Sequence, residues 1–339
     1  MSARRRPSPI RPHFRPVAVM RVFITGIEGF VGRHLAPALR AAGHEVAGSV
    51  LRAGAGDGLV TMDVRDEGQV RRAIGEARPE VVFHLAGEAS VSVSFDRPVE
   101  VYEVNAGGAL HVLEACRRAA VGRVMLITSC EIYGDLDPAA GPAAETREMA
   151  PISPYGGSKA DQELVGEQYA RTFGLDVVRV RSFPHTGPGQ KEPYLFPSVA
   201  RRIAEAEGGR GPGTVTVGYV DVVRDLLDVR DVVRAYLLLM ERGRAGEAYN
   251  VCGGLGRSLR ETLEEMCGLA RVPVRLEVDR SRRRPADAAW MVGDPSKLRS
   301  ETGWRPEIGW RETANDLLED ARARMAADAS PAATETAGG

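Results

Sequence analysis

Residues 21–32 read RVFITGIEGFVG, a short apolar run followed at once by three regularly spaced glycines. The run has the β-branched and aromatic composition of a buried strand, and a helical pattern follows the last glycine. In such a strand-to-helix turn Gly26 permits the tight turn, Gly29 lets the backbone approach a pyrophosphate, and Gly32 lets helix and strand pack closely. The stretch predicts a dinucleotide-binding loop, with a purely structural turn as the alternative.

Beyond this loop the chain alternates short apolar runs with longer helical patterns. The helical patterns cover 31–43, 67–77 and 105–120. Near-continuous apolar strands separated by helices form a parallel sheet that is covered on both faces. We therefore predict an α/β fold, a Rossmann-type doubly wound parallel sheet. The predicted strands are RVFIT (21–25), HEVAGSV (44–50), GLVTMD (58–63), VVFHLA (81–86), VMLITS (124–129) and LDVVRVRSF (175–183).

After the sixth predicted strand the alternation loosens, and glycine and proline interrupt the pattern. We predict a Rossmann domain over 20–183, to which later segments within about 220–255 return, and a smaller α/β substrate-binding lobe made mainly of 184–325. Such a lobe would lie over the carboxyl ends of the strands, where open α/β sheets bind ligands. The Arg- and Pro-rich segment 1–19 and the segment 326–339 have the composition of disordered tails.

The bulk composition excludes several classes of protein. With 339 residues, 43% hydrophobic positions and 27% charged positions, the chain has an ordinary globular composition. A net charge of -1 argues against a nucleic-acid-binding scaffold. The four cysteines form no CxxC pair, so neither a metal site nor a disulfide framework is predicted, and a reducing cytoplasm is the expected location. No apolar run approaches the roughly 20 residues of a membrane span.

The end of the second predicted strand bears on which dinucleotide binds. An acidic residue there would hold the ribose 2′-hydroxyl of NAD, whereas this chain has Arg52, which suits a 2′-phosphate. NADP(H) is therefore the preferred cofactor, NAD(H) remains possible, and a plain surface charge is the alternative role for Arg52. Asp63 and Val64 are expected at the adenine edge. The predicted cofactor contacts are Gly26, Glu28, Gly29, Phe30, Val31, Gly32, Arg52, Asp63, Val64, Leu85, Ala86, Gly87, Tyr155 and Lys159.

A catalytic set is predicted where YGGSK opens a helical pattern. Tyr155 and Lys159 are four residues apart and share one helix face. A neighbouring ammonium lowers the pKa of a phenol, which would let Tyr155 exchange a proton with a substrate oxygen near neutral pH. Ser129, at a strand end, can donate a hydrogen bond to the same oxygen. Glu131 faces the same cleft or is an exposed loop carboxylate, and Cys130 is expected to be a packed small residue.

The motifs TGIEGFVG (25–32), HLAGEASV (84–91), SCEIYG (129–134) and YGGSK (155–159) together resemble the extended short-chain dehydrogenase/reductase family, the NAD-dependent epimerases and dehydratases, across about 20–325. The resemblance implies a Rossmann domain that binds NAD(P)(H) and a lobe for a nucleotide sugar. It also implies a Ser, Tyr and Lys catalytic set at the positions named above. Members often form homodimers through the segment 155–170, and a tetramer is the alternative.

Later motifs look like the GDP-4-keto-6-deoxy-D-mannose reductase branch of that family, whose near relatives are GDP-mannose 4,6-dehydratases. They are PHTGPGQ (184–190), VGYVDVVRDLLDVRDVVRAY (217–236), AYNVCGG (248–254) and RPADAAWMVGDPSKLRSETGWRPEIGWRET (284–313). The resemblance implies that Arg224 and Arg284 help hold a diphosphate. The alternatives are an Arg224–Asp225 ion pair and a solvated charge run. The predicted substrate contacts are Ser90, Glu131, His185, Arg224 and Arg284.

The expected reaction is NADPH-dependent reduction of a C4 keto group to give GDP-D-rhamnose. The alternative is 4,6-dehydration of GDP-mannose, for which Glu131 would serve as base. Two features favour the reductase: Cys130 stands where the dehydratases have serine, and the segment 52–63 lacks their longer basic insertion. A dinucleotide-sensing regulator is the non-enzymatic alternative, although it would have no use for a Tyr155 proton relay. A GDP-linked sugar is the expected partner, without nucleic acid or membrane.

Overall fold

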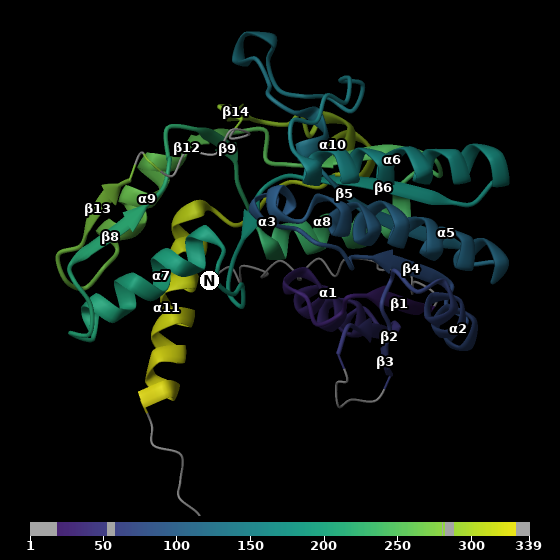
Figure 1. Ribbon diagram of the computed structural model, residues 1–339, viewed down its shortest axis with the longest axis horizontal. Helices are drawn as coiled ribbons and strands as arrows, with labels where there is room; N and C mark the ends of the chain where they lie inside the picture. The colour runs from purple at the N-terminus through teal and green to yellow at the C-terminus, as the bar shows by residue number, and fades with distance from the viewer. Residues whose placement is uncertain (1–18, 53–57, 280, 282–287, 330–339) are drawn as a thin grey trace, which may run out of the picture.

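The computed structural model describes residues 19–52, 58–279, 281 and 288–329. It confirms the doubly wound fold: a parallel sheet of seven strands runs in the order β11-β6-β5-β4-β1-β2-β3 (Figure 1). The strand order reverses between β1 and β4, which opens a crevice at the strands' carboxyl ends. The strands are β1 (Arg21–Thr25), β2 (Glu45–Val50), β3 (Leu59–Thr61), β4 (Val81–His84), β5 (Arg123–Ser129), β6 (Val177–Ser182) and β11 (Ala248–Val251).

Apolar side chains project from both faces of this sheet, and helices pack against both faces. Val22 and Ile24 of β1 belong to a core cluster with α1, α8 and α10, while Phe23 points into a second cluster with α2, α5 and α6. This alternation follows from the two-residue period of a strand. The covering helices are α1 (Phe30–Ala41), α2 (Glu67–Ala77), α5 (Gly108–Arg118), α6 (Pro154–Phe173), α8 (Val229–Arg242) and α10 (Ser296–Thr302).

The connections after β4 and β5 differ from simple helices. The helix predicted over 105–120 opens with a π-helical turn, η1 (Glu103–Gly107), and α5 follows it. π-Turns inside helices are often found at functional sites. Shorter elements lie nearby: α3 (Val91–Asp96), α4 (Pro98–Tyr102) and the 3₁₀ turns η2 (Cys130–Tyr133) and η3 (Pro138–Ala140).

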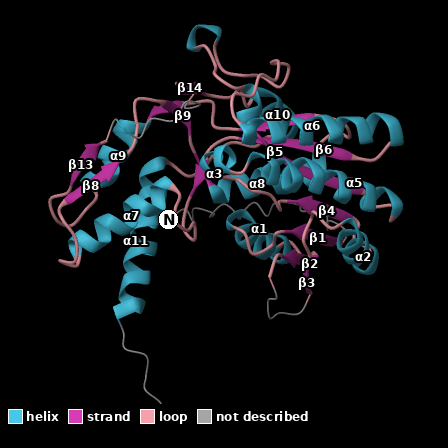
Figure 2. Cartoon of the chain, viewed as in Figure 1, coloured by secondary structure: helices cyan, strands magenta, loops and turns pink. Residues whose placement is uncertain are grey.

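A smaller lobe lies beside the carboxyl ends of the strands, with helices α7, α9 and α11 around the strand pair β8 and β13 (Figures 1 and 2). A three-stranded sheet, β12-β9-β14, lies between this lobe and the helices of the Rossmann domain. The elements are β7 (His185–Thr186), α7 (Leu195–Glu207), β8 (Thr214–Val217), β9 (Val223–Asp225), β10 (Leu227–Asp228), β12 (Gly256–Ser258), α9 (Leu259–Gly268), β13 (Arg275–Val278), β14 (Trp290–Met291) and α11 (Trp310–Ala329).

The boundaries of the two lobes differ from those we predicted. The chain returns to the main sheet after 220, where β11 pairs with β6 and α8 packs on α1. However, α10 also packs in the Rossmann domain, where Leu298 and Trp304 join its core. Helix α11 continues through 326–329, so the predicted start of the C-terminal tail was too early. The alanines of this segment are strong helix formers, which explains the extension.

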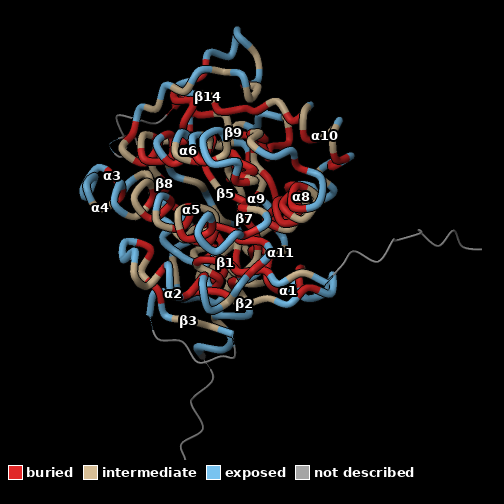
Figure 3. The backbone as a smooth tube through the Cα atoms, turned by 90° about the vertical axis from the view of Figure 1, so that its right-hand side faces the viewer, coloured by how far each residue is buried: buried red, intermediate tan, exposed pale blue. Residues whose placement is uncertain are grey.

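Burial is concentrated in the strands and inner helix faces (Figure 3). All four cysteines are buried and none forms a disulfide. Within the described residues, no helix is both long and apolar enough to cross a bilayer.

Candidate active site

The glycine turn after β1 has the geometry that the sequence predicted. Gly26 has a φ of +69°, a left-handed conformation that favours glycine. A Cβ at Gly32 would lie 2.4 Å from the carbonyl oxygen of Ile27, so a side chain there would push helix α1 away from the turn. Gly29 is the N-terminal cap of α1, where free backbone N–H groups and the helix dipole favour an anion.

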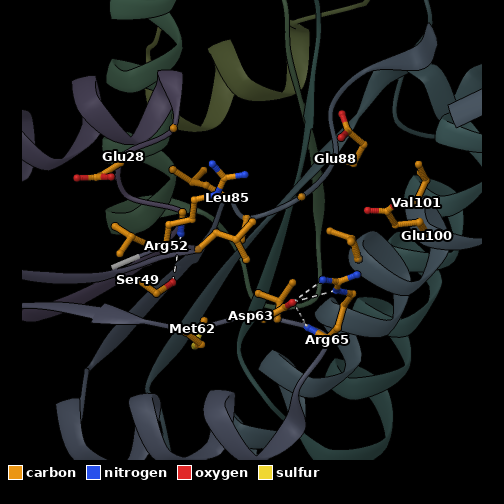
Figure 4. A pocket seen from close by; sticks show the side chains of 18 of the residues that line it. Glu28, Ser49, Arg52, Met62, Asp63, Arg65, Leu85, Glu88, Glu100 and Val101 are labelled. Carbon is orange, nitrogen blue, oxygen red and sulfur yellow. Dashed lines mark hydrogen bonds and ion pairs between the residues drawn. The ribbon is translucent and has the colours of Figure 1, made fainter. Parts of the chain in front are cut away.

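An outer cavity of about 630 Å³ extends from this turn past the ends of β2 and β3. Arg52 lines one side and the Asp63–Arg65 ion pair the other (Figure 4). The guanidinium of Arg65 lies 2.6 Å from the Asp63 carboxylate, and this hydrogen bonding lowers the pKa of Asp63. The Asp63 carboxylate is therefore already engaged by a cation, an interaction that the sequence did not predict.

An inner cavity of about 500 Å³ lies on the other side of the same glycine turn. Ser129, Glu131, Tyr155 and Lys159, the four predicted catalytic residues, all line it. Helix α6 begins where Ser153 accepts a hydrogen bond from the N–H of Gly156 at 3.0 Å, which places Tyr155 in the first turn. The structure thus brings together a strand end, a 3₁₀ turn and a helix start.

The predicted effect of Lys159 on Tyr155 is wrong for this arrangement. Burial raises the pKa of the Tyr155 phenol, and a hydrogen bond with Ser129 only partly opposes this rise. The negative charge of Glu131 raises it further, whereas Lys159 is not among the main influences. The reason is that desolvation of a buried phenolate outweighs nearby favourable contacts. The phenol therefore keeps its proton at neutral pH.

Lys159 has partners that the sequence analysis missed. Its Nζ donates to the Gln162 side-chain oxygen at 2.8 Å and to the Ile127 carbonyl at 3.2 Å. Burial lowers the pKa of Lys159 to about 8. The signal was present in the sequence, because residues three apart on a helix are neighbours, but nothing showed that both would face inward.

A second missed residue, Asn105, joins the two halves of the site. It lies in the π-turn η1 and is fully buried. Its amide donates to Ser158 at 2.9 Å and to the Glu88 carbonyl at 3.0 Å, and it accepts from the Glu88 N–H at 2.9 Å. Asn105 therefore ties the loop after β4, which lines both cavities through Leu85 and Gly87, to the catalytic helix.

The predicted substrate residues have different placements. His185 lines the inner cavity, and its ring stacks on Phe30 with centroids 6.2 Å apart. Ser90 accepts from the Val93 N–H at 3.2 Å and caps α3, so its hydroxyl has a structural partner. Arg284 lies outside the described residues.

Arg224 does not form the alternative ion pair with Asp225. The Asp225 carboxylate instead accepts from the backbone N–H groups of Gly253 at 2.7 Å and Gly254 at 2.8 Å. Adjacent residues of a strand point to opposite faces, which separates the two side chains. Burial raises the pKa of Asp225 to about 6.

All the predicted cofactor contacts line one or both cavities. The outer cavity includes Arg52, Asp63 and Val64, and the inner one includes Phe30 and Lys159. The two cavities share the glycine turn and the loop after β4, so one elongated ligand can contact both. The shared lining residues are Gly26, Gly29, Leu85 and Gly87.

Comparisons with known proteins agree with this geometry. The family model described as GDP-mannose 4,6 dehydratase matches residues 23–317. The GDP-6-deoxy-D-mannose reductase of Pseudomonas aeruginosa is 35% identical over 309 residues, covering 90% of this chain and 98% of that protein. A dTDP-glucose 4,6-dehydratase of Actinoplanes is 29% identical, covering 86% of this chain and 95% of that protein.

Solved structures give the same picture. The structure of RMD from Pseudomonas aeruginosa complexed with NADPH superimposes with a TM-score of 0.81 at 34% identity, covering 90% of this chain and 100% of that one. The Thermus thermophilus UDP-glucose 4-epimerase in complex with NAD also has a TM-score of 0.81, at 33% identity, covering 89% of this chain and 99% of that one. Relatives with either dinucleotide therefore share this fold.

Proposed function

The chain belongs to the GDP-mannose 4,6-dehydratase family, within the short-chain epimerases and dehydratases, and on this premise we propose that it reduces the C4 keto group of GDP-4-keto-6-deoxy-D-mannose to give GDP-D-rhamnose. The observation that carries the proposal is the convergence of Ser129 and Tyr155 on a cavity that also reaches the glycine turn. The similarity to a GDP-6-deoxy-D-mannose reductase over most of both chains supports the same reaction.

The residues present fit a dinucleotide cofactor, preferably NADP(H). The glycine turn leaves no room for a Cβ at Gly32 and presents the start of α1 to a pyrophosphate. Arg52, in the outer cavity, suits a 2′-phosphate because a guanidinium can donate two parallel hydrogen bonds to it. When bound, NADPH supplies the hydride that reduces C4.

The protein's own groups would handle the proton. Tyr155, kept protonated by burial, donates its proton to the C4 oxygen, and Ser129 donates a hydrogen bond to the same oxygen. Two contacts would hold α6 in place beside the nicotinamide. Asn105 hydrogen-bonds to Ser158 of α6, and Lys159 of α6 hydrogen-bonds to the Ile127 carbonyl of β5.

Substrate binding would rely on the lobe that lies over the strand ends. Arg224, on β9, is free of an Asp225 pair and is proposed to bind the diphosphate. Arg284 is proposed for the same diphosphate, and His185 for the sugar. The nucleotide is proposed to be a GDP-linked one because a relative named GDP-6-deoxy-D-mannose reductase is 35% identical to this chain.

A 4,6-dehydratase is the second candidate because of Glu131. Its side chain lines the same cavity as Tyr155 and acts electrostatically on that phenol. A carboxylate in this position is suited to removing a C5 proton. Cys130, which follows Ser129, is buried with a raised pKa and so offers no ready second proton.

Two assays of the purified protein separate the candidates. We expect oxidation of NADPH with the 4-keto sugar nucleotide and no reaction of GDP-mannose with NADP⁺ alone. Conversion of GDP-mannose to a 4-keto product, without reduction of that product, would establish the dehydratase instead. NADPH binding without turnover of either sugar would support the sensing regulator.

We also propose that the chain forms a homodimer through α5 and α6. Leu110 of α5 and Leu164 and Phe173 of α6 are apolar and 42%, 51% and 49% exposed. The variant Leu164→Glu is expected to shift the protein from dimer to monomer in sedimentation velocity, because an uncompensated charge in an apolar interface is costly. Leu255→Glu, in the lobe and 75% exposed, is the matched control and should stay dimeric.

A further inference from the structure

The side chain of Gln162 holds the ammonium of Lys159. Gln162 is 1% exposed and Lys159 7% exposed, so both amide and ammonium are removed from water. The Gln162 Oε1 accepts from the Lys159 Nζ at 2.8 Å, and the Gln162 Nε2 donates to the Ile127 carbonyl at 3.3 Å. The same carbonyl accepts from Nζ at 3.2 Å, which closes a small ring of three groups.

Burial, and not a neighbouring charge, is the influence that shifts the pKa of Lys159, although Glu131 lines the same cavity. Among the described residues Lys159 forms no salt bridge. On β4, His84 is neutral, because burial and the charge of Lys159 lower its pKa to about 3. On α6, Tyr155 keeps its proton, and Glu163 is engaged by Arg181 at 2.7 Å.

The ammonium of Lys159 also faces the loop after β4, which lines both cavities. A Cβ built on Gly87 would lie 3.5 Å from Nζ, so the backbone of this loop approaches the ammonium closely. An ammonium has three N–H donors. The Gln162 oxygen and the Ile127 carbonyl accept two of them on the protein side, which leaves one toward the inner cavity.

We propose that Gln162 is a positioning residue that keeps Lys159 in its ammonium form and directs its remaining N–H toward the inner cavity. The part of this inference that concerns the nicotinamide ribose as acceptor rests on the proposed function. The part that concerns the protonation of Lys159 does not. The physical reason is that a buried charge needs hydrogen-bond partners to offset its lost hydration.

The ammonium of Lys159 is finely balanced, so the loss of one acceptor is measurable. Burial lowers its pKa to about 8, close to physiological pH. Removing a partner of the charged form shifts the equilibrium toward the neutral amine. Gln162→Leu should therefore lower the pKa of Lys159, and Gln162→Glu, which replaces a dipole by a charge, should raise it. A merely structural role would not produce shifts of opposite sign.

The sequence makes a direct measurement practical, because Lys159, Lys191 and Lys297 are its only lysines. We would label the full-length protein with [ε-¹³C]lysine and follow the carbon shifts by NMR from pH 6 to pH 11. The variants Lys191→Arg and Lys297→Arg would assign the remaining signals. Relative to the unchanged protein, we expect the Lys159 midpoint to fall by about one pH unit in Gln162→Leu and to rise by a similar amount in Gln162→Glu.

The matched control is Gln168→Leu, the same substitution at an exposed position of α6. It should leave the Lys159 midpoint unchanged. Identical midpoints in Gln162→Leu and the unchanged protein would overturn the proposal, as would a shift of the same sign in both Gln162 variants. Circular dichroism would first verify that each variant is folded.

A second readout tests the direction of the remaining N–H. NADPH affinity, followed by fluorescence across the same pH range, should be lost as the pH rises and Lys159 loses its proton. Compared with the unchanged protein, this loss should occur at a lower pH in Gln162→Leu and at a higher pH in Gln162→Glu. Shifted NMR midpoints without a shift in NADPH affinity would overturn the ribose part only. If the Lys159 midpoints shift in the Gln162 variants but the unchanged protein does not reduce the 4-keto sugar, the proposed function is refuted and the role of Gln162 stands.

Discussion

The outer and inner cavities share one glycine turn but differ in how far their charged and titratable side chains are exposed to water. In the outer cavity the cations lie near the surface, and Arg65, with a side chain 43% exposed, pairs with Asp63. In the inner cavity Tyr155 is 8% and Lys159 7% exposed. Water and salt screen the first set of charges, whereas burial changes the protonation equilibria of the second.

This difference indicates two tasks for the two ends of one ligand. Exposed guanidiniums recognise a phosphate by charge and leave their own protonation unchanged. Burial lowers the pKa of Lys159 to about 8, near neutral pH, and keeps the Tyr155 phenol protonated, so that it is available as a proton donor. Substitutions at the inner cavity should therefore affect the rate of turnover, and those at the outer cavity should affect cofactor affinity and its salt dependence.

The largest expected effect comes from Tyr155→Phe, which removes the proton donor and keeps the ring. We expect kcat for 4-keto sugar reduction to fall by about 10² to 10⁴, the usual contribution of a positioned acid. NADPH affinity, measured by fluorescence, should change less than about threefold. Tyr169→Phe is the matched control on the same helix, since its hydroxyl contacts Glu114 at 3.2 Å outside both cavities. A kcat of Tyr155→Phe within tenfold of the unchanged protein would contradict the role of Tyr155 as the proton donor.

A smaller effect is expected at the outer cavity from Arg52→Ala. Loss of a charge-assisted contact of about 1.5 to 3 kcal/mol should raise the KM for NADPH by about 10- to 100-fold, with little change in the KM for NADH. The dependence of NADPH binding on salt should weaken as well. Arg71→Ala, an exposed change on α2 away from the cavities, serves as control. An equal loss of affinity for both cofactors would contradict the 2′-phosphate role.

The smallest effect concerns His84, the buried last residue of β4, whose pKa is influenced by the charge of Lys159. Thr25 Oγ1 accepts from the N–H groups of Leu85 and Ala86 and so donates to His84 Nδ1 at 2.9 Å, while Nε2 is buried without a partner. The pKa of His84 is lowered to about 3, below its unfolded value of about 6.5. Between these values the unfolded chain binds the proton and the native chain does not, so stability falls as pH drops.

His84→Asn removes this titration. Its unfolding free energy, from urea titrations at pH 7 and pH 5, should fall less on acidification than that of the unchanged protein, by up to about 1.4 kcal/mol per pH unit. Parallel pH dependences in the two proteins would show that the inner region does not keep His84 neutral.

Much of the fold was predictable because its signals are local. The glycine turn, the strand and helix periods, and the spacing of Tyr155 and Lys159 each depend on a few consecutive residues. The same reasoning placed all four catalytic candidates on one cavity. Boundaries were less accurate: the helix predicted over 105–120 opens on the π-turn η1, so α5 begins only at Gly108.

The partners of the site residues were not predictable in the same way. Asn105 and Ser158 meet although 53 residues separate them, and Asp225 finds the N–H groups of Gly253 and Gly254 rather than its neighbour Arg224. Such contacts depend on how distant elements are brought together, and no periodicity records this.

The sequence by itself determined which catalytic side chains this protein has and that they lie near the carboxyl ends of the strands, because strand and helix geometry are set by neighbouring residues. Only the tertiary structure decided their protonation. The phenol of Tyr155 keeps its proton and Lys159 has a pKa near 8 because the assembled chain excludes water from both. Desolvation is a property of the packed molecule, so it cannot be read from the spacing of residues.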